Sequence, residues 1–207
     1  MIIMEHSKVF TTKFMVRTSI FGAIATILYL IPGIKLPFFL GFLEIHFDEI
    51  PAFIASFAYG PLCGTFVIII KTLIKLFFST SAGVGELMDL IYGLALILPA
   101  SIYYKKNRTF KGAIIGLVIS TIVHLLVTFI CSATFVIDLY CLIYAGLTQE
   151  QVLQMAQLLV PQVSNVHASI AFYCFLPFNL FKDVIITTLT ILLYPRVRYF
   201  TEKRYKK

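Results

Sequence analysis

The sequence has 207 residues, of which 59% are hydrophobic and only 13% are charged. This composition, with a mean hydropathy of +0.93, excludes an ordinary soluble domain and indicates an integral membrane protein. The formal net charge of +7 is compatible with nucleic-acid binding, but the basic residues gather just outside apolar segments, where the positive-inside rule explains them. We therefore expect the lipid bilayer as a partner and no nucleic acid.

The cysteines have none of the short spacings of a zinc-binding or redox motif. We therefore assign no metal ligands and expect no cofactor. Two of the cysteines, Cys141 and Cys174, flank the most polar segment, and whether they pair is left open. The full set is Cys63, Cys131, Cys141 and Cys174.

Long apolar segments predict an all-α membrane protein that forms a single domain over residues 1–207. A short amphipathic helix is predicted at about residues 148–160, on the extracellular surface of the bundle. The six predicted transmembrane helices cover about residues 12–31, 48–59, 62–78, 84–104, 112–137 and 175–194.

Small residues recur at four-residue spacing in the first predicted helix. Ser19 with Ala23, and Gly22 with Thr26, form small-xxx-small pairs, which let another helix approach closely. The pattern fits a docking face for a partner subunit, and it fits packing inside the bundle equally well.

The stretch from Pro32 to Phe47 is rich in phenylalanine although proline and glycine interrupt it. A loop exposed to water would rarely be so apolar. The helix predicted after it has about 12 residues and spans about 18 Å, short of the ~30 Å hydrocarbon core. We therefore expect the loop to reach membrane depth and to cover the pocket as a lid. Asp48, an aspartate just before the next helix, is expected to cap that helix. The aromatic candidates for ligand contact are Phe38, Phe39, Phe42 and Phe47.

Charged residues occur at the facing ends of the third and fourth predicted helices. Lys71 and Lys75 lie one turn apart near the end of the third helix, and Glu86 and Asp89 open the fourth. A short connection makes the two helices antiparallel neighbours, so the four residues share one end of the bundle. Pairing among them is the simplest expectation because buried charges need partners. Ligand contact by one of them, with Lys71 as the candidate, is the alternative.

A polar stripe follows one face of the sixth predicted helix, at steps of three or four residues. An ionisable residue at membrane depth costs at least about 2.5 kcal/mol and therefore faces the bundle interior, a partner or a ligand. Asp183 is expected to pair with Lys182 or with a lysine of the third helix. His124, inside the fifth helix, is expected to be a hydrogen-bonded core residue. The stripe consists of Asn179, Lys182, Asp183, Thr187 and Thr190.

The distribution of basic residues predicts the orientation in the membrane. Of the 17 lysines and arginines, 13 lie at the start of the first helix, after the fourth or after the sixth. Six spans with both termini in the cytoplasm place all three groups inside. The outer side then holds the aromatic loop and the start of the sixth helix, which together describe an outward-facing ligand pocket.

Motifs for catalysis or ATP hydrolysis do not occur in the sequence. It contains no Walker A loop, HExxH or GxSxG motif, so we assign no catalytic residues and do not expect an enzyme. The alternative of another class is a small multipass membrane enzyme that uses Asp48, Glu49, Glu86 or Asp89. A chain of this size with an outer pocket suggests a binding subunit that relies on others for energy.

Five short motifs occur in order along the chain, from the region after the first helix to the sixth. They are Phe47–Pro51, Tyr59–Pro61, Lys71–Leu73, Gly85–Asp89 and Pro177–Lys182. In combination they resemble the S components of energy-coupling factor (ECF) vitamin transporters, and most closely the riboflavin-binding type. The resemblance covers nearly the whole chain.

The resemblance implies a subunit of the bacterial cytoplasmic membrane that binds riboflavin from outside with high affinity. Uptake would require a transmembrane coupling subunit and two ATPases. In riboflavin-type members an asparagine and a lysine of helix six contact the flavin, and here they are Asn179 and Lys182, while the loop after helix one shields the pocket. Ser132 stands where such members commonly have a ligand-reading asparagine. The same fold with another vitamin or precursor is therefore the alternative.

Overall fold

The computed structural model describes residues 11–79, 81–143 and 147–205, with side chains described up to residue 196. This part of the chain is nearly all helical, and its strands form one short antiparallel hairpin in which Ile34 pairs with Ile45. In chain order the elements are α1 (Thr12–Leu30), β1 (Ile34–Lys35), β2 (Glu44–Ile45), α2 (Glu49–Tyr59), α3 (Pro61–Leu76), α4 (Val84–Lys106), α5 (Phe110–Cys131), the π-helical segment η1 (Ser132–Val136), α6 (Ile137–Ile143), α7 (Gln149–Leu159), α8 (Ala168–Ile170), the π-helical segment η2 (Ala171–Phe175) and α9 (Leu176–Tyr205).

Four helical stretches among the described residues are long and apolar enough to cross a membrane. They are α1, α4, the continuous stretch Phe110–Ile143, and Ala168–Arg196. The chain is therefore a multi-pass membrane protein. With 11 and 16 residues, α2 and α3 reach only about 17 and about 24 Å, so the six predicted spans include two that are short for a ~30 Å bilayer core.

Local sequence signals account for several helix ends. The Thr109 hydroxyl accepts a hydrogen bond from the Gly112 N–H (2.9 Å) and so caps α5. Between α2 and α3 the chain turns at Gly60, whose φ of 104° is readily adopted only by glycine, and Pro61 begins α3.

The expectation that Asp48 caps α2 is wrong. Asp48 has helical backbone angles and makes no side-chain hydrogen bond to the start of α2. Its carboxylate instead forms an ion pair with Lys71, because a buried ammonium binds a carboxylate more strongly than a backbone N–H does.

The last two long helices extend beyond their predicted ends. The fifth continues through η1 and α6 to Ile143, past Asp138, whose half-exposed carboxylate accepts a hydrogen bond from Gln149 Nε2 (2.7 Å). The sixth begins at Ala168 and continues through Pro195 to Tyr205. Proline removes one N–H donor from the helix, and the helical backbone resumes after it.

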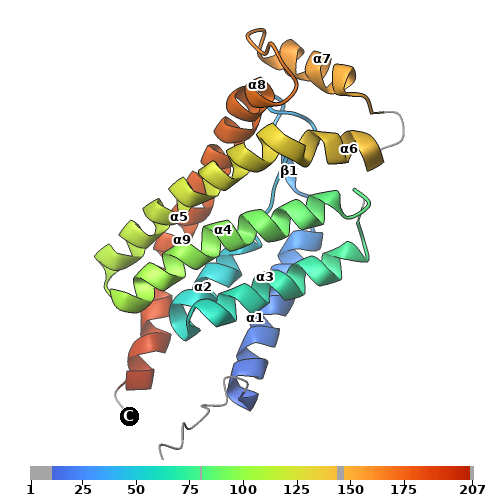
Figure 1. The fold of residues 1–207 in the computed structure, drawn as a ribbon. Coiled ribbons are helices and arrows are strands. Elements are labelled where there is room, and N and C mark those ends of the chain that lie inside the picture. Colours follow the sequence, from blue (N-terminus) through green and yellow to red (C-terminus); the bar gives the residue numbers. More distant parts are fainter. Residues whose placement is uncertain (1–10, 80, 144–146, 206–207) are drawn as a thin grey trace, which may run out of the picture.

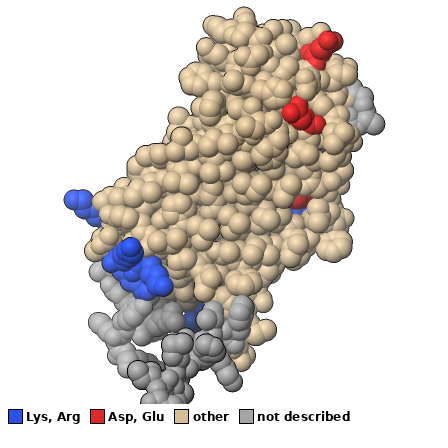
Figure 2. Space-filling view, viewed as in Figure 1, with Lys and Arg blue, Asp and Glu red and all other residues tan. Residues whose placement is uncertain are grey.

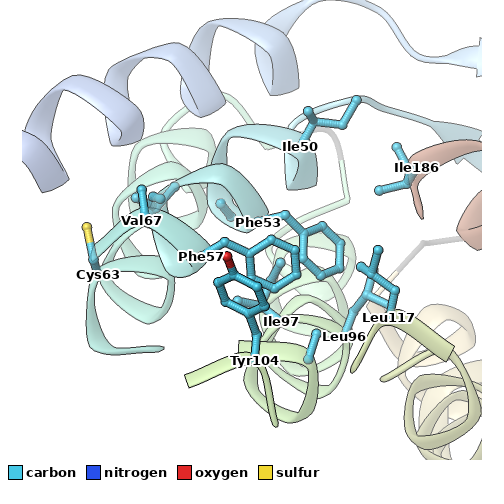
Figure 3. Packing of buried hydrophobic residues seen from close by; sticks show 14 of the residues in the cluster. Ile50, Phe53, Phe57, Cys63, Val67, Leu96, Ile97, Tyr104, Leu117 and Ile186 are labelled. Carbon is cyan, nitrogen blue, oxygen red and sulfur yellow. The ribbon is translucent and has the colours of Figure 1, made fainter. Parts of the chain in front are cut away.

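The main hydrophobic core lies between α2, α3, α4, α5 and α9. In Figure 3 the rings of Phe53, Phe57 and Tyr104 lie side by side, with 4.6 Å between the ring centroids of Phe57 and Tyr104 and an angle of 40° between their planes. α2 and α3 approach so closely that a Cβ at Gly64 would lie 2.5 Å from the Ser56 Cβ. This core fixes the position of α2, which carries charged residues at its start.

A second buried cluster connects the hairpin with η1, η2, α4 and α7. It includes Leu40, Met88, Val136, Val152 and Phe175. The cysteines on this side, Cys131, Cys141 and Cys174, are free thiols, as is Cys63 in the main core. The cluster anchors the loop after α1 to the end of the bundle where α7 and α8 lie.

The two ends of the bundle differ in charge. In Figure 1 the start of α1, the α4–α5 connection and the end of α9 lie at the lower end, while the hairpin, α7 and α8 lie at the upper end. Figure 2 shows Lys and Arg on the lower part of the visible face, Asp and Glu mainly on the upper part, and a broad band with few charges between them. Exposed apolar side chains recur every four residues along α5, at Val118, Ile122, Leu126 and Ile130, as expected for a helix face in contact with lipid.

Candidate functional site

Lys71 lies at the centre of a buried group of charges near the hairpin. Its side chain comes from α3 and is fully buried, with Nζ paired to Asp48 Oδ2 before α2 and to Asp89 Oδ2 of α4 at 2.7 Å. The Tyr29 ring of α1 lies 4.7 Å from the same nitrogen. The predicted pairing across the α3–α4 connection is thus confirmed for Lys71 with Asp89, and Asp48 is a partner that we did not predict.

Lys182 forms the second part of this group. Its Nζ pairs with Glu49 Oε1, which joins the upper part of α9 to the first turn of α2. Glu49 is 2% exposed and Lys182 is 9% exposed, so both charges lie inside the protein. We call the five residues Asp48, Glu49, Lys71, Asp89 and Lys182 the charged cluster. It contains three carboxylates and two ammonium groups.

Lys75 and Glu86 lie outside the charged cluster. Lys75 donates to the Tyr29 carbonyl (3.2 Å). The Glu86 carboxylate accepts hydrogen bonds from the hydroxyls of Ser79 (2.7 Å) and Ser81 (2.8 Å) at the turn before α4. The predicted ion pairing among these lysines and acids is therefore confirmed only for Lys71 with Asp89. Nearby backbone and hydroxyl groups bind Lys75 and Glu86 instead.

Residues 36–43 connect the two strands of the hairpin, and we call this phenylalanine-rich segment the aromatic turn. It packs against α6, η2 and α9. The ring centroid of Phe39 lies 5.3 Å from that of Phe178 and 6.3 Å from that of Phe181. These two phenylalanines flank Asn179 and Leu180 in the sequence. Phe42 lies 5.6 Å from Tyr140 and 6.2 Å from Phe175. Aromatic rings of the turn are thus in contact with the segment that carries Asn179 and Lys182.

The other two predicted aromatic contacts lie in different surroundings. Phe38 is 59% exposed and touches Phe39. Phe47, which follows the hairpin, packs against the main core. His46, directly before Phe47 in sequence, contacts the Tyr29 ring edge-on, with 5.1 Å between the ring centroids. Burial lowers the pKa of the His46 imidazole, and the nearby Lys182 ammonium lowers it further, while the carboxylates of Glu49, Asp89 and Glu44 act in the opposite direction.

The polar stripe of α9 faces the bundle interior, with Asn179, Lys182, Asp183 and Thr190 all buried. Asn179 Nδ2 donates to the Phe175 carbonyl (2.9 Å). Asp183 Oδ2 pairs with His124 Nδ1 of α5 at 2.7 Å. The prediction that Asp183 pairs with a lysine is therefore wrong, and the prediction that His124 is a hydrogen-bonded core residue is confirmed.

Ser132 begins the π-helical segment η1 and is fully buried. Its hydroxyl lies 3.4 Å from the Tyr92 hydroxyl of α4, and the Tyr92 ring lies 5.7 Å from His124. π-Helical segments often occur at functional sites because they shift side chains out of the regular α-helical register. Here η1 packs against η2, the corresponding segment just before α9.

The small residues of α1 point in two directions. A Cβ at Gly22 would lie 3.0 Å from Ile70 of α3, and the Thr26 hydroxyl donates to the Gly22 carbonyl (2.8 Å). Both residues are buried, whereas Ser19 and Ala23 are exposed. The contacts of Gly22 and Thr26 are those of internal packing, and docking by Ser19 and Ala23 stays a prediction.

Oxygen atoms of Asp48, Glu49 and Asp89 lie within 4.8 Å of one another, close enough to hold a metal ion. However, Lys71 already pairs with Asp48 and Asp89, and Lys182 pairs with Glu49. Two ammonium groups thus occupy the positions from which a metal ion would neutralise these carboxylates. The chemistry of the cluster favours hydrogen bonding to a polar ligand over metal binding.

These features define a multi-pass helical membrane protein with a buried polar site beneath an aromatic hairpin. Over residues 13–194 the chain matches the family described as the substrate-specific component of ECF transporters. It belongs to this family of transport subunits, in agreement with the prediction that it is not an enzyme. The family resemblance predicted from the motifs is confirmed.

Known proteins match nearly the full length of this chain. The chain is 29% identical to the riboflavin transporter RibU of Staphylococcus aureus (strain TCH60), over 92% of this chain and 93% of the relative. It is 28% identical to the riboflavin transporter FmnP of Bacillus subtilis (strain 168), over 93% and 95%. A structure reported under "Structure and mechanism of the S component of a bacterial ECF transporter" matches with a TM-score of 0.71 and 29% identity, over 91% of this chain and 96% of the other.

Proposed function

We propose that this chain is the riboflavin-binding S component of an ECF transporter and that it mediates uptake of the vitamin. Both relatives named above are riboflavin transporters that match this chain over nearly its whole length. The observation in this chain that carries the proposal is the contact of Phe39 with Phe178 and Phe181. It brings the aromatic turn of the hairpin onto the α9 segment that contains Asn179 and Lys182.

The residues of this region suit a flavin. An isoalloxazine ring is flat and largely apolar, and it carries carbonyl and ring-nitrogen acceptors. Phe39 and Phe42 offer aromatic faces to such a ring, while the ammonium of Lys182 and the amide of Asn179 provide donors for its acceptors. Of the remaining candidates, Lys71 supports the site through its ion pairs, and Ser132 offers a hydroxyl next to Tyr92.

We propose six membrane spans with both termini in the cytoplasm. The exposed basic residues Lys105, Lys106, Arg108 and Lys111 surround the α4–α5 connection, at the same end as the start of α1 and the end of α9 (Figure 1). The positive-inside rule then assigns this end to the cytoplasm. The hairpin and α7 lie on the outer side, from which riboflavin enters.

Transport requires energy that this chain does not supply. We propose that it associates with the transmembrane coupling subunit and two ATPases of an ECF module in the bacterial cytoplasmic membrane. Family membership supports these partners, and the exposed Ser19 and Ala23 of α1 are the candidate docking residues.

A titration tests the proposed ligand. Riboflavin is added to the purified chain in detergent, and flavin fluorescence is recorded at each step. We expect saturable quenching with a dissociation constant below micromolar. If flavin fluorescence remains unchanged at micromolar riboflavin, the proposed ligand is wrong and other vitamins must be tested.

A second candidate is an S component for a different vitamin or precursor. The observation that favours it is Ser132, which stands where riboflavin-type members commonly have an asparagine and whose hydroxyl lies 3.4 Å from that of Tyr92. Serine lacks the planar amide that can both donate to and accept from a flavin edge. If riboflavin does not bind, the thermal melting of the chain is measured with each other vitamin in turn, and the vitamin that raises the melting temperature identifies the ligand.

A further inference from the structure

Within the part of the chain that the structure describes, two carboxylates of the charged cluster each have a buried oxygen without a hydrogen-bond partner. Six such side-chain atoms occur among the described residues. Three of them lie within four consecutive positions that lead from the hairpin into α2: His46 Nδ1, Asp48 Oδ1 and Glu49 Oε2. The other three belong to Thr72 of α3, Thr128 of α5 and Asp183 of α9, whose second carboxylate oxygen pairs with His124.

Such atoms are rare in native proteins, and each one requires an explanation. A buried acceptor without a donor costs roughly 1–3 kcal/mol, and a charged one costs more. Asp48 and Glu49, which are adjacent in sequence, each pair with a lysine through one carboxylate oxygen and leave the other without a donor among the described residues. The position of these two oxygens therefore indicates a binding site next to Lys182.

The type of atom indicates what binds there. Ionised carboxylates only accept hydrogen bonds, and the unpartnered oxygens of Asp48 and Glu49 therefore need donors. Within the charged cluster three carboxylates face two ammonium groups, so the excess charge is negative. A neutral ligand with several O–H donors fits this environment, whereas an anion does not.

Riboflavin has two chemically distinct parts. Its ring system carries a single N–H donor and is otherwise apolar or accepting, while its ribityl chain carries several hydroxyls. The aromatic turn offers an apolar surface through Phe39 and Phe42. The segment that leads from β2 into α2 offers the unpartnered acceptors. Only the ribityl chain has enough donors to satisfy more than one of them.

On the basis of the proposed function, we propose that Asp48 and Glu49 bind the ribityl chain of the flavin. Asp48 Oδ1 and Glu49 Oε2 accept hydrogen bonds from its hydroxyls, while their other oxygens remain paired with Lys71 and Lys182. The start of α2 is thus a specificity-determining part of the site, which recognises the hydroxylated chain of the ligand.

The test compares riboflavin with lumiflavin, a flavin in which a methyl group replaces the ribityl chain. Both ligands are titrated into the wild-type chain and into Asp48→Asn. This substitution keeps the size of the side chain, and Lys71 retains Asp89 at 2.7 Å as a partner. The matched control is Glu86→Gln, which neutralises a buried carboxylate of α4 that is bound by Ser79 and Ser81.

We expect the wild type to bind riboflavin at least about tenfold more tightly than lumiflavin, because hydroxyls that donate to carboxylates form strong hydrogen bonds. Asp48→Asn is expected to weaken riboflavin binding about tenfold, since the charge-assisted bond becomes a neutral one, and to leave lumiflavin binding within about twofold. Glu86→Gln is expected to leave both affinities unchanged. Thermal melting of each variant checks that its fold is intact.

Equal binding of riboflavin and lumiflavin by the wild type would overturn this inference and leave the proposed function standing. Equal weakening of both ligands by Asp48→Asn would also overturn it, because Asp48 would then act only through Lys71. A wild type that binds neither flavin would overturn the proposed function together with the inference. If Asp48→Asn does not fold, the wild-type comparison and Glu49→Gln decide the question.

Discussion

Lys182 of α9 and Glu49 of α2 form a buried ion pair that connects the last long helix to the helix that follows the hairpin. Because Glu49 lies directly after Asp48, and Asp48 pairs with Lys71, two adjacent carboxylates connect α2 to α9 and α3. The hairpin leads into these residues through His46 and Phe47. The position of the aromatic turn over α9 therefore depends on the same contacts that hold the charged cluster together.

Removal of the Lys182 charge should affect stability as well as binding. Lys182→Met leaves the Glu49 carboxylate buried without its cation, and breaking a buried pair in this way costs about 3–5 kcal/mol. We expect a lower free energy of unfolding and weaker riboflavin binding, measured by chemical denaturation and by flavin fluorescence.

The double variant Lys182→Met with Glu49→Gln separates the two effects. Without an unpaired buried charge, it should recover most of the lost stability. Its binding is measured with lumiflavin, which lacks the ribityl chain assigned to Glu49, and it should bind this flavin more weakly than the wild type does. If the double variant binds lumiflavin as tightly as the wild type, Lys182 does not contact the flavin ring.

Replacement of Asn179 should weaken riboflavin binding. Its Nδ2 donates to the Phe175 carbonyl, which leaves the other N–H and Oδ1 for a ligand. We expect Asn179→Ala to reduce the binding free energy by about 1–3 kcal/mol, as is typical for the loss of a buried polar contact. The control is Thr190→Val on the same face of α9, where the hydroxyl donates to the Ile186 carbonyl. If Thr190→Val reduces the binding free energy by the same amount, the polar stripe supports the fold and does not contact riboflavin.

Two neighbouring residues of α1 should respond differently to the same substitution. Ala23→Leu adds bulk on an exposed face and should reduce riboflavin uptake by cells without changing binding by the purified chain. Gly22→Leu adds bulk 3.0 Å from Ile70 of α3 and should destabilise the bundle by about 1–3 kcal/mol through overpacking. Normal uptake by the Ala23→Leu variant would contradict a docking role for the exposed face.

The His124–Asp183 pair should stabilise the packing of α5 against α9. His124→Leu leaves a buried carboxylate without its partner and should lower the free energy of unfolding by about 3–5 kcal/mol. Adding Asp183→Leu should recover much of that loss, because apolar residues replace both polar groups. Additive losses in this double-mutant cycle would show that the two side chains are not coupled.

The all-helical class and approximate helix positions could be predicted from the sequence because apolar length and glycine or proline interruptions are local signals. The pairing of Lys71 with Asp89 was predictable for a similar reason. The short Ser79–Gly83 connection makes α3 and α4 antiparallel neighbours, and a pattern of charges at their facing ends then specifies the contact.

Contacts between helices distant in sequence could not be predicted in the same way. Glu49 meets Lys182, and His124 meets Asp183, only because α9 packs against both α2 and α5. No local pattern encodes those neighbours. Asp48 has the residue type and position of a helix cap, yet its carboxylate binds Lys71, since the buried ammonium outweighs the local signal. The π-helical segment at Ser132 likewise has no sequence signature that we recognised.

Titration of riboflavin into the wild type and Lys182→Gln, measured side by side, tests the central claim most directly. This substitution retains a polar side chain that can hydrogen-bond to Glu49. We predict saturable binding by the wild type at one riboflavin per chain and at least about tenfold weaker binding by the variant, since a charge-assisted contact is lost. Equal affinities in two folded proteins would contradict the assignment of Lys182 to the flavin site, and no binding to the wild type would contradict the function itself.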